Sequence, residues 1–471
     1  MRVLFPWRLS RRSPANLVGH APLRPMRWWP AAALGVVFVV AGGAIAMALL
    51  GVWAPVPASV VDPNAYQLDR VKVGLTVSAG LAAGVTLLIT LRRQTLSERT
   101  QWFTEADAIE RRITDLYVAA TDQLGSEKSA VRLAGLHALE RLGQAHPPLR
   151  QTVVDVVCAY LRMPYLPPYE LLDDVAKESN IDPIEDSATR QELQVRLTAQ
   201  RLLARHFRSD NVIGERGDHS PTYWTNEDGS RLNIDLTGAA LVDFSFSNCT
   251  IGRFECRGAD FYGGAGFMET RFFDYVEMAE TRFWSSAGFA GAEFHGVARF
   301  DNATFDGFAA FLGTRFESHA SLVSVVFRAN ASLREAAFKS DVDFAGAVFE
   351  GATDLTASNF WSYAELGGLQ FLRFVDFTDV TFHSETKVAR LRIGGGANLV
   401  GLRFFCPVEL VDAKFFGRVD LDAVLAEGFN PAGALVSDEV HLPAGWKRGP
   451  ILDNKLSRVV ADTPEVSERS A

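Results

Sequence analysis

The sequence predicts a mainly β protein, a solenoid of short stacked strands, which follows a helical region with two membrane-spanning helices. Three observations support this fold class. From Phe261 to Leu421, a large apolar residue recurs at alternating steps of six and five residues without interruption. A mostly small residue, such as Ala259 or Ala265, lies two positions before these residues. Near the amino end, two uncharged runs cover residues 28–61 and 73–91.

The eleven-residue repeat is typical of short strands with one inward face. Residues i and i−2 of an extended chain point to the same side, so each large residue shares the interior with a small one. The residues between them are Gly, Asp, Arg, Ser and Glu, which suit turns and solvent. One such unit cannot bury its apolar residue alone, whereas stacked units can. The repeat positions are Phe261, Phe267, Phe272, Met278, Phe283, Phe289, Phe294, Phe300, Phe305, Phe311, Phe316, Leu322, Phe327, Leu333, Phe338, Phe344, Phe349, Leu355, Phe360, Leu366, Phe371, Phe377, Phe382, Val388, Ile393, Leu399, Phe404, Leu410, Phe415 and Leu421.

Upstream of Phe261 the spacing shortens to five residues, through Leu236, Leu241, Phe246, Ile251 and Cys256. With segments such as 258–261 (Gly-Ala-Asp-Phe), this stretch resembles the pentapeptide-repeat family. The consensus of that family is a small residue, a polar residue, Leu or Phe, and two more polar residues. The resemblance implies a right-handed quadrilateral β-helix over 232–425, with one repeat on each side. The downstream part is similar to an eleven-residue variant with about twenty-two residues per turn.

Steps of twenty-two residues test the four-sided arrangement. One column reads Phe261, Phe283, Phe305, Phe327, Phe349, Phe371, Ile393 and Phe415. The column two sides away reads Phe272, Phe294, Phe316, Phe338, Phe360, Phe382 and Phe404. Nearly pure Phe columns are expected where aromatic rings stack along the tube axis. About thirty-five sides make about nine turns, and strands ~4.8 Å apart then give a length of about 40 Å.

The two uncharged runs predict transmembrane helices over 28–54 and 73–91, joined by an external loop over 55–72. About twenty helical residues at ~1.5 Å each cross a ~30 Å hydrocarbon layer. Trp28 and Trp53 lie where an aromatic belt is expected.

Positive charge lies at the two outer ends of this hairpin. Residues 1–27 form a basic segment with six Arg and no acidic residue, and Arg92, Arg93 and Arg99 follow the second run. The positive-inside rule therefore places both termini in the cytoplasm. We expect a multi-pass protein of the inner cell membrane, whose first partner is the lipid bilayer.

Residues 92–208 are predicted to form a cytoplasmic helical region. Helices are expected up to Gly125, after Ser126, at about Leu149–Arg162, and at about Thr189–Arg208. The run 130–142 resembles one half of a HEAT-type helical repeat. An acid-rich connector at 170–186 and a polar linker at 209–231 complete this region.

This order of segments is similar to that of membrane-anchored bacterial pentapeptide-repeat proteins. After Leu421 the repeat lapses, and we expect 426–471 to form an irregular cap and a loose tail. The apolar residues around Phe429, Leu435 and Trp446 are candidates for covering the carboxyl end of the tube, and the 189–208 helix for covering the other end.

The sequence predicts no catalytic, cofactor-binding or metal-binding residues, and we expect no enzyme activity. Cys249 and Cys256 fall on inward positions, and Cys158 and Cys406 have no CxxC spacing. The His residues are dispersed, and Gly394-Gly395-Gly396 lacks the Lys-Ser/Thr ending of a phosphate loop.

The net charge of the predicted solenoid indicates which class of partner it binds. Residues 232–425 contain 25 Asp plus Glu and 16 Lys plus Arg, a balance of −9, which argues against nucleic-acid binding. We therefore expect a membrane-tethered scaffold that presents the β-helix to an unknown protein partner, with homo-oligomerisation left open. Two alternatives remain: a DNA-mimicking regulator of an enzyme such as gyrase, and an accessory subunit of a channel or transporter.

Overall fold

The structure is a computed structural model of the 471-residue chain, and it describes residues 28–49, 51, 55–57, 59–168, 187–209, 223–452 and 456–462. The chain divides into two compact units, Met1–Arg111 and Arg112–Ala471, and each is described by itself. The basic segment 1–27 and the acidic connector 170–186 lie outside the described residues.

The first unit contains helix α1 (Trp28–Leu49) and most of the long helix α2 (Pro63–Leu124). Helix α2 begins at Pro63, ten residues before the predicted second span, so part of the predicted loop is helical. Asp62 explains this start: its carboxylate accepts hydrogen bonds from the N–H groups of Asn64 and Ala65, at 3.1 and 3.3 Å. An Asp N-cap followed by Pro at the first helical position is a strong helix start.

One helical segment among the described residues, Pro63–Gln94, is long and apolar enough to cross a membrane. The most apolar eighteen-residue stretch of this segment has a mean hydropathy of 1.9, and almost none of that stretch is buried. Within α1 a shorter apolar segment, Gly35–Ala48, packs on this helix: a Cβ built at Gly42 would lie 2.8 Å from Leu81. Where two spans were predicted, one candidate membrane helix is found. This helix contains the predicted second span, 73–91, whereas the first span, 28–54, and the multi-pass topology remain predictions.

The second unit begins with helices that pack around an apolar core. They are α3 (Ser129–Ala145), the short 3-10 helix η1 (Pro147–Leu149), α4 (Arg150–Arg162) and α6 (Ser187–Phe207). The last two match the helices predicted at 149–162 and 189–208. Their buried side chains, which include Leu139, Val157 and Leu203, join the same apolar core as the solenoid interior.

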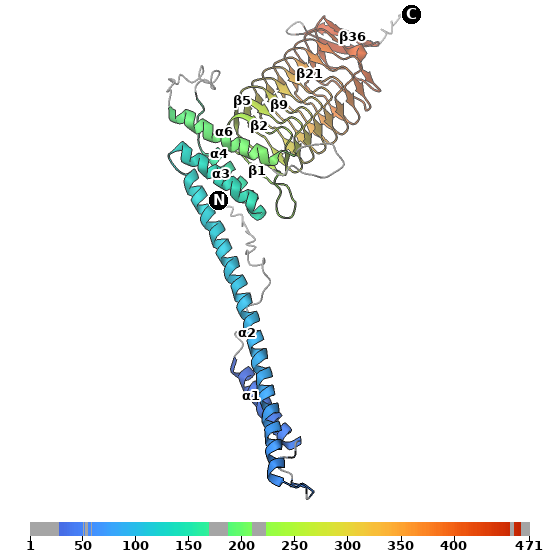
Figure 1. The fold of residues 1–471 in the computed structure, drawn as a ribbon. Coiled ribbons are helices and arrows are strands. Elements are labelled where there is room, and N and C mark those ends of the chain that lie inside the picture. The colour runs from blue at the N-terminus through green and yellow to red at the C-terminus, as the bar shows by residue number, and fades with distance from the viewer. Residues whose placement is uncertain are drawn as a thin grey trace, which may run out of the picture. The chain divides into compact units, whose positions relative to one another are not determined.

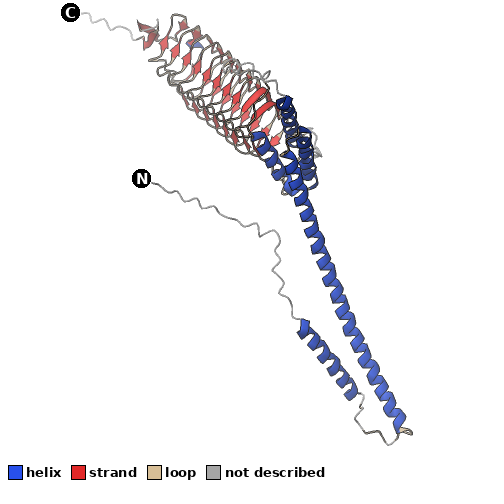
Figure 2. Ribbon diagram, turned by 90° about the vertical axis from the view of Figure 1, so that its left-hand side faces the viewer, coloured by secondary structure: helices blue, strands red, loops and turns tan. Residues whose placement is uncertain are grey.

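A parallel β-solenoid of about nine turns follows the helices, and Figures 1 and 2 show its strands stacked turn upon turn. A typical turn contributes four two-residue strands, one to each of four parallel ladders, which we call walls 1 to 4 in chain order.

The bounds of the strands, wall by wall, are as follows. Wall 1 consists of β1 (Ile234–Asp235), β4 (Phe254–Glu255), β7 (Val276–Glu277), β11 (Ala298–Arg299), β15 (Ala320–Ser321), β19 (Val342–Asp343), β23 (Ala364–Glu365) and β27 (Thr386–Lys387). Wall 2 consists of β2 (Ala240–Ser245), β5 (Asp260–Gly266), β8 (Arg282–Phe283), β12 (Thr304–Phe305), β16 (Val326–Phe327), β20 (Val348–Phe349), β24 (Gln370–Phe371), β28 (Arg392–Ile393), β31 (Lys414–Phe415) and β34 (Leu435–Val436). The longer strands β2 and β5 continue into wall 3, which goes on with β9 (Ala287–Gly288), β13 (Ala309–Ala310), β17 (Ala331–Ser332), β21 (Thr353–Asp354), β25 (Val375–Asp376), β29 (Ala397–Asn398), β32 (Val419–Asp420) and β35 (Val440–His441). Wall 4 consists of β3 (Thr250–Ile251), β6 (Arg271–Phe272), β10 (Glu293–Phe294), β14 (Arg315–Phe316), β18 (Ala337–Phe338), β22 (Asn359–Phe360), β26 (Thr381–Phe382), β30 (Arg403–Phe404) and β33 (Leu425–Ala426).

The register confirms the two spacings found in the sequence. In the first turn Ile234 pairs with Phe254, twenty residues on, and in the next turn Phe254 pairs with Val276, twenty-two residues on. One added residue is accommodated by an irregularity in the β2–β5 pairing between Val242 and Phe244, and the second is added between Phe272 and Val276. Asp243, which lies between Val242 and Phe244, has φ +46°.

The predicted repeat positions line the interior. All are buried except Phe404, which is partly buried. In the two Phe columns, neighbouring rings lie 4.4–5.0 Å apart and within 19° of parallel. Phe316 and Phe338, predicted to be neighbours one turn apart, pair in register with ring centroids 4.8 Å apart.

The predicted carboxyl boundary of the solenoid at 425 is too early. Parallel pairing continues into β34 and β35, where Val436 follows Phe415 and Val440 follows Val419 at a spacing of twenty-one residues. That spacing breaks the eleven-residue period, so the repeat pattern misses these strands. The segment predicted to be irregular then forms an antiparallel hairpin of β36 (Trp446–Ile451) and β37 (Ser457–Ala461), and β37 also pairs antiparallel with β34.

Candidate interaction surfaces

The amino end of the solenoid is closed by side-chain amides that imitate another strand. Gln151 of α4 donates to the carbonyl oxygen of Asn233 at 3.0 Å and accepts from its N–H at 2.9 Å. Gln200 of α6 pairs in the same way with Val242, at 2.7 and 3.3 Å. The exposed edge of a sheet otherwise leaves such groups unpaired. Two of the four ladder edges are therefore completed by one Gln each.

The end of α6 closes the rest of the first turn. Phe207 lies on the lumen, with its ring centroid 5.9 Å from that of Phe246. The backbone of Arg208 forms an isolated antiparallel β-bridge with that of Cys249. The N–H of Ser209 donates to the carbonyl oxygen of Asn248 at 3.2 Å. This packing leaves the outer walls, and not the amino end, as the accessible surface of the tube.

A buried Trp in the predicted linker 209–231 packs against helices α3 and α6. Trp224 stacks on His206, with ring centroids 3.8 Å apart, and its Nε1–H donates to Gln144 at 2.8 Å. A Cβ at Gly143 would lie 2.5 Å from the Trp224 ring, so this contact requires Gly. The predicted linker 209–231 thus contains a core residue that the sequence analysis missed.

Glu140 joins three basic side chains next to this Trp. It lies 3.2 Å from His137 Nδ1, 3.0 Å from Arg205 Nη1 and 3.0 Å from His206 Nε2. Burial raises the pKa of the Glu140 carboxyl, but hydrogen bonds from His137 and His206 outweigh it and hold the pKa below its ordinary value. The group is ionised at neutral pH and stabilises the packing of α3 against α6.

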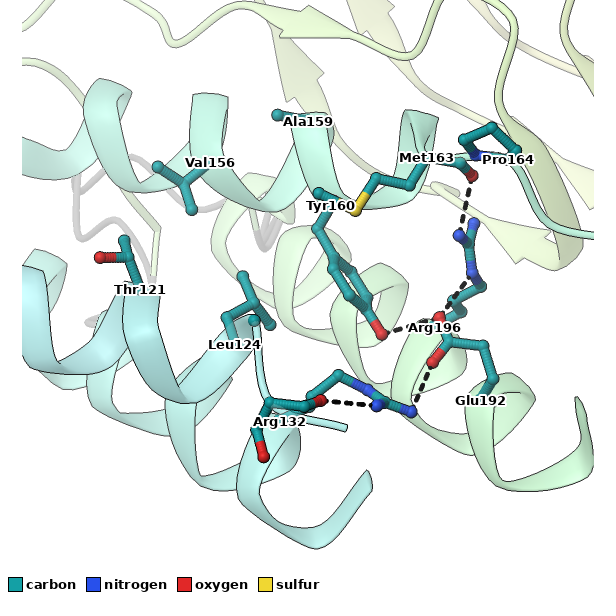
Figure 3. Close-up of a pocket in the computed structure, with 12 residues that line it drawn as sticks. Thr121, Leu124, Arg132, Val156, Ala159, Tyr160, Met163, Pro164, Glu192 and Arg196 are labelled. Carbon is teal, nitrogen blue, oxygen red and sulfur yellow. Dashed lines mark hydrogen bonds and ion pairs between the residues drawn. The ribbon is translucent and has the colours of Figure 1, made fainter. Parts of the chain in front are cut away.

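A pocket lies between the end of α2, α4 and α6 (Figure 3). Its volume is about 500 Å³, and Leu124, Val156 and Met163 line its apolar side. At its polar end, the Glu192 carboxylate accepts from Arg132 at 2.8 Å and from Arg196 at 2.8 Å.

The polar end of the pocket is fixed by internal bonds. Arg196 also donates to the carbonyl oxygens of Leu161 and Met163, at 2.9 and 2.8 Å. Tyr160 donates its hydroxyl to Glu192 at 2.7 Å, and burial together with this carboxylate raises the Tyr160 pKa, so the phenol stays neutral. The bonds hold the ends of α4 and α6 together, which is a structural role.

Some charges on the outer walls form ion pairs between turns. On wall 4, Glu293 lies between Arg271 and Arg315, at 3.3 and 3.1 Å. On wall 2, Asp306 lies 2.7 Å from Arg282 and 2.9 Å from Arg328, which is outward-facing as predicted. These ion pairs neutralise Glu293 and Asp306 locally, while the net charge of residues 232–425 stays at −9.

Wall 4 also carries an exposed row of three stacked rings with a Lys at one end, which we call the aromatic strip: Lys339, Trp361, His383 and Phe405. These residues follow the Phe column by one position and recur every twenty-two residues. Trp361 and His383 stack at 4.0 Å, His383 and Phe405 at 5.2 Å, and the Lys339 ammonium lies 4.5 Å from the Trp361 ring. Trp361 is 46% exposed and Phe405 58% exposed.

The other residues that the sequence singled out are scattered. Cys158, Cys249 and Cys256 are buried, and burial raises the pKa of the first two thiols to about 12. Gly394-Gly395-Gly396 forms the bend between β28 and β29. Within the described ranges, His, Cys, Asp and Glu side chains form no group of three suited to a metal ion. The sequence analysis missed the aromatic strip, although the twenty-two-residue spacing used for the interior would have revealed it.

Comparison of this chain with protein-family models, with curated proteins and with solved structures finds no match.

Proposed function

We propose that this protein is a non-enzymatic scaffold, tethered to the inner cell membrane by its amino-terminal hairpin. On this proposal the solenoid is a right-handed quadrilateral β-helix of the pentapeptide-repeat type, and it lies in the cytoplasm. The repeat sequence, the four parallel ladders and the apolar segment Pro63–Gln94 support it.

The aromatic strip is the observation that carries the scaffold function. Aromatic side chains are enriched at the centres of protein interfaces, and Trp is a frequent hot spot. Here Trp361 and Phe405 are held in fixed positions by stacking on His383, so little conformational entropy is lost when a partner binds. Lys339 at one end of the strip adds a positive charge. The strip therefore suits a protein partner with an apolar patch beside an acidic side chain.

The ion pairs of the walls favour this reading over DNA mimicry. A DNA mimic presents rows of unneutralised negative charge, whereas Glu293 and Asp306 are each held between two Arg side chains. A supercoiling assay with gyrase tests the alternative directly. The fragment for that assay starts at residue 112, so that it keeps Gln151, Gln200 and Phe207, which close the amino end of the solenoid.

Proximity labelling in cells tests the scaffold function. The full chain is fused to a labelling enzyme and compared with the Trp361→Ala/Phe405→Ala double variant. A Val400→Ala/Val411→Ala variant is the matched control, because both Val side chains are also exposed on the solenoid. We expect the double variant to lose a defined set of neighbours that the control keeps. An unchanged set of neighbours in a normally folded double variant contradicts the proposal.

A further inference from the structure

The pocket between the end of α2, α4 and α6 has the composition of a small-molecule site. All of its lining residues belong to the second unit. Its volume of about 500 Å³ lies within the usual range for such sites, about 300–1,000 Å³, which combine mostly apolar walls with a few polar groups. Leu124, Val156, Met163 and Pro164 form apolar parts of the wall, and Met163 is 55% exposed, so a ligand can reach this side from solvent.

The charged residues that line the pocket leave one positive charge in excess. They are Arg132, Arg196 and Glu192, so two guanidinium groups share one carboxylate. Each guanidinium binds a different oxygen of Glu192, as the dashed lines in Figure 3 show. The side chains of Arg132 and Arg196 are only 15% and 5% exposed. Keeping an unbalanced charge out of water costs free energy, which a bound anion would recover.

Arg132 is the guanidinium with an unused donor. Arg196 donates through its Nε and both of its Nη atoms, to Glu192 and to two carbonyl oxygens. Arg132 donates from Nη2 to Glu192, and from Nη1 to the carbonyl oxygens of Ser126 and Glu127, at 2.8 and 3.0 Å. Its Nε–H is buried and has no hydrogen-bond partner among the described residues. The internal bonds therefore leave part of the binding capacity of Arg132 free.

We propose that this pocket binds a small carboxylate with an apolar body, such as a benzoate or a short acyl chain. The carboxylate lies beside Arg132, and the apolar body lies against Leu124, Val156 and Met163. One excess positive charge matches a monoanion, whereas a phosphate group, with a charge of about −1.5 to −2, would leave a negative excess. Water alone can satisfy the donor of Arg132, but only an apolar body removes the apolar wall from water. The site does not depend on the proposed function.

The charge of the ligand separates this proposal from simple filling of a cavity. A carboxamide has nearly the same shape as a carboxylate and keeps an acceptor oxygen, but it carries no charge. Hydrogen bonds between a guanidinium and a carboxylate are roughly twice as strong as neutral ones. We therefore expect the carboxylate to bind at least about tenfold more tightly than the matching carboxamide.

Photolabelling of the purified full chain tests the site. A diazirine-bearing benzoate and the corresponding benzamide are each illuminated with the protein, and the labelled residues are identified by mass spectrometry. Ala159→Trp adds a large side chain at an exposed position of the pocket wall. Thr152→Trp is its matched control, because Thr152 is exposed on the same helix but does not line the pocket.

A second pair of variants tests the charge. Arg132→Gln removes the excess positive charge from the pocket. Arg141→Gln is the matched control, because Arg141 is exposed on the same helix, α3, outside the pocket. Far-ultraviolet circular dichroism checks that each variant is folded.

In the expected result, the benzoate labels residues 121–126 and 156–164 at least about tenfold more than the benzamide does. Ala159→Trp abolishes labelling by both probes. Arg132→Gln removes the difference between the probes but keeps the weaker labelling by the benzamide, which shows that the pocket is intact. The two control variants change neither signal.

Equal labelling of the unchanged protein by the two probes overturns the proposal. Labelling that lies outside the pocket, or that Ala159→Trp does not reduce, overturns it as well. If Arg132→Gln does not fold, the comparison of the two probes on the unchanged protein and on Ala159→Trp decides the question by the same criteria.

Discussion

Phe316 shows how the interior holds the tube together at the scale of one residue. Its ring lies 4.8 Å from both Phe294 and Phe338, and the side chain is almost completely buried. Phe316→Ala removes both stacking contacts and leaves a cavity, so we expect it to cost about 3–5 kcal/mol of unfolding free energy.

The matched control for Phe316 is Arg328. Its ion pair with Asp306 is on the surface, with the Arg328 side chain 48% exposed, and such pairs contribute about 0–1 kcal/mol. Denaturant melts of the two Ala variants measure the difference. Equal losses would contradict the inward and outward assignment.

Glu140 makes the stability of the helical region depend on pH. Because its pKa in the folded state is below its ordinary value, its contribution is present above about pH 4.3, the unfolded value, and is lost as pH falls through the folded value. We expect Glu140→Gln to be less stable than the unchanged protein at pH 7, with a difference that narrows below about pH 4.

Urea melts at pH 7, 5 and 3.5 measure the effect of Glu140→Gln. Glu127→Gln is the control, because this side chain is exposed and lies in the same helical region. A difference that stays constant with pH would show that Glu140 contributes through packing and not through its charge.

At the scale of the element, the ends of the ladders depend on a few polar side chains. Gln200→Leu keeps the size of the side chain but leaves the Val242 N–H and carbonyl oxygen unpaired. Each unpaired buried polar group costs about 1–3 kcal/mol, so we expect a clear loss of stability.

Gln194 is the control for Gln200, since it lies on the same helix and is exposed. Amide hydrogen exchange adds a readout that locates the effect. Faster exchange in β2 and β5 is expected for Gln200→Leu alone. If both Leu variants exchange alike, the Gln amide does not complete the ladder.

The boundaries of the elements show where sequence reasoning reaches its limit. The start of α2 depends on Asp62 and Pro63, a standard cap that lies inside a segment read as a loop because Asp69, Arg70 and Lys72 follow. The strands β34 and β35 are hidden because one residue is missing from the period. Trp224 lies in a polar segment, and only its burial against His206 and Gly143 in the structure shows that it is a core residue.

At the scale of the whole molecule, the solenoid is predictable because its contacts are periodic. Each inward side chain contacts the equivalent side chain one turn later, so a sequence spacing of twenty-two residues predicts the contact. Phe294, Phe316 and Phe338 stack on one another in this way. The candidate surfaces are less predictable. In the column of the aromatic strip, Glu317 and Lys339 separate the stacked pair Phe273 and His295 from Trp361, His383 and Phe405. The pocket at Arg132 and Glu192 joins helices whose packing has no period.

The central claim is that a membrane hairpin tethers a cytoplasmic solenoid. Reporter fusions measure it most directly: one after residue 60, between α1 and α2, and one at the carboxyl terminus of the full chain. A periplasm-active enzyme and a cytoplasm-active fluorescent protein serve as the two reporters. The account predicts that residue 60 lies outside the inner membrane and the carboxyl terminus inside. Both fusions reporting the same side would contradict it.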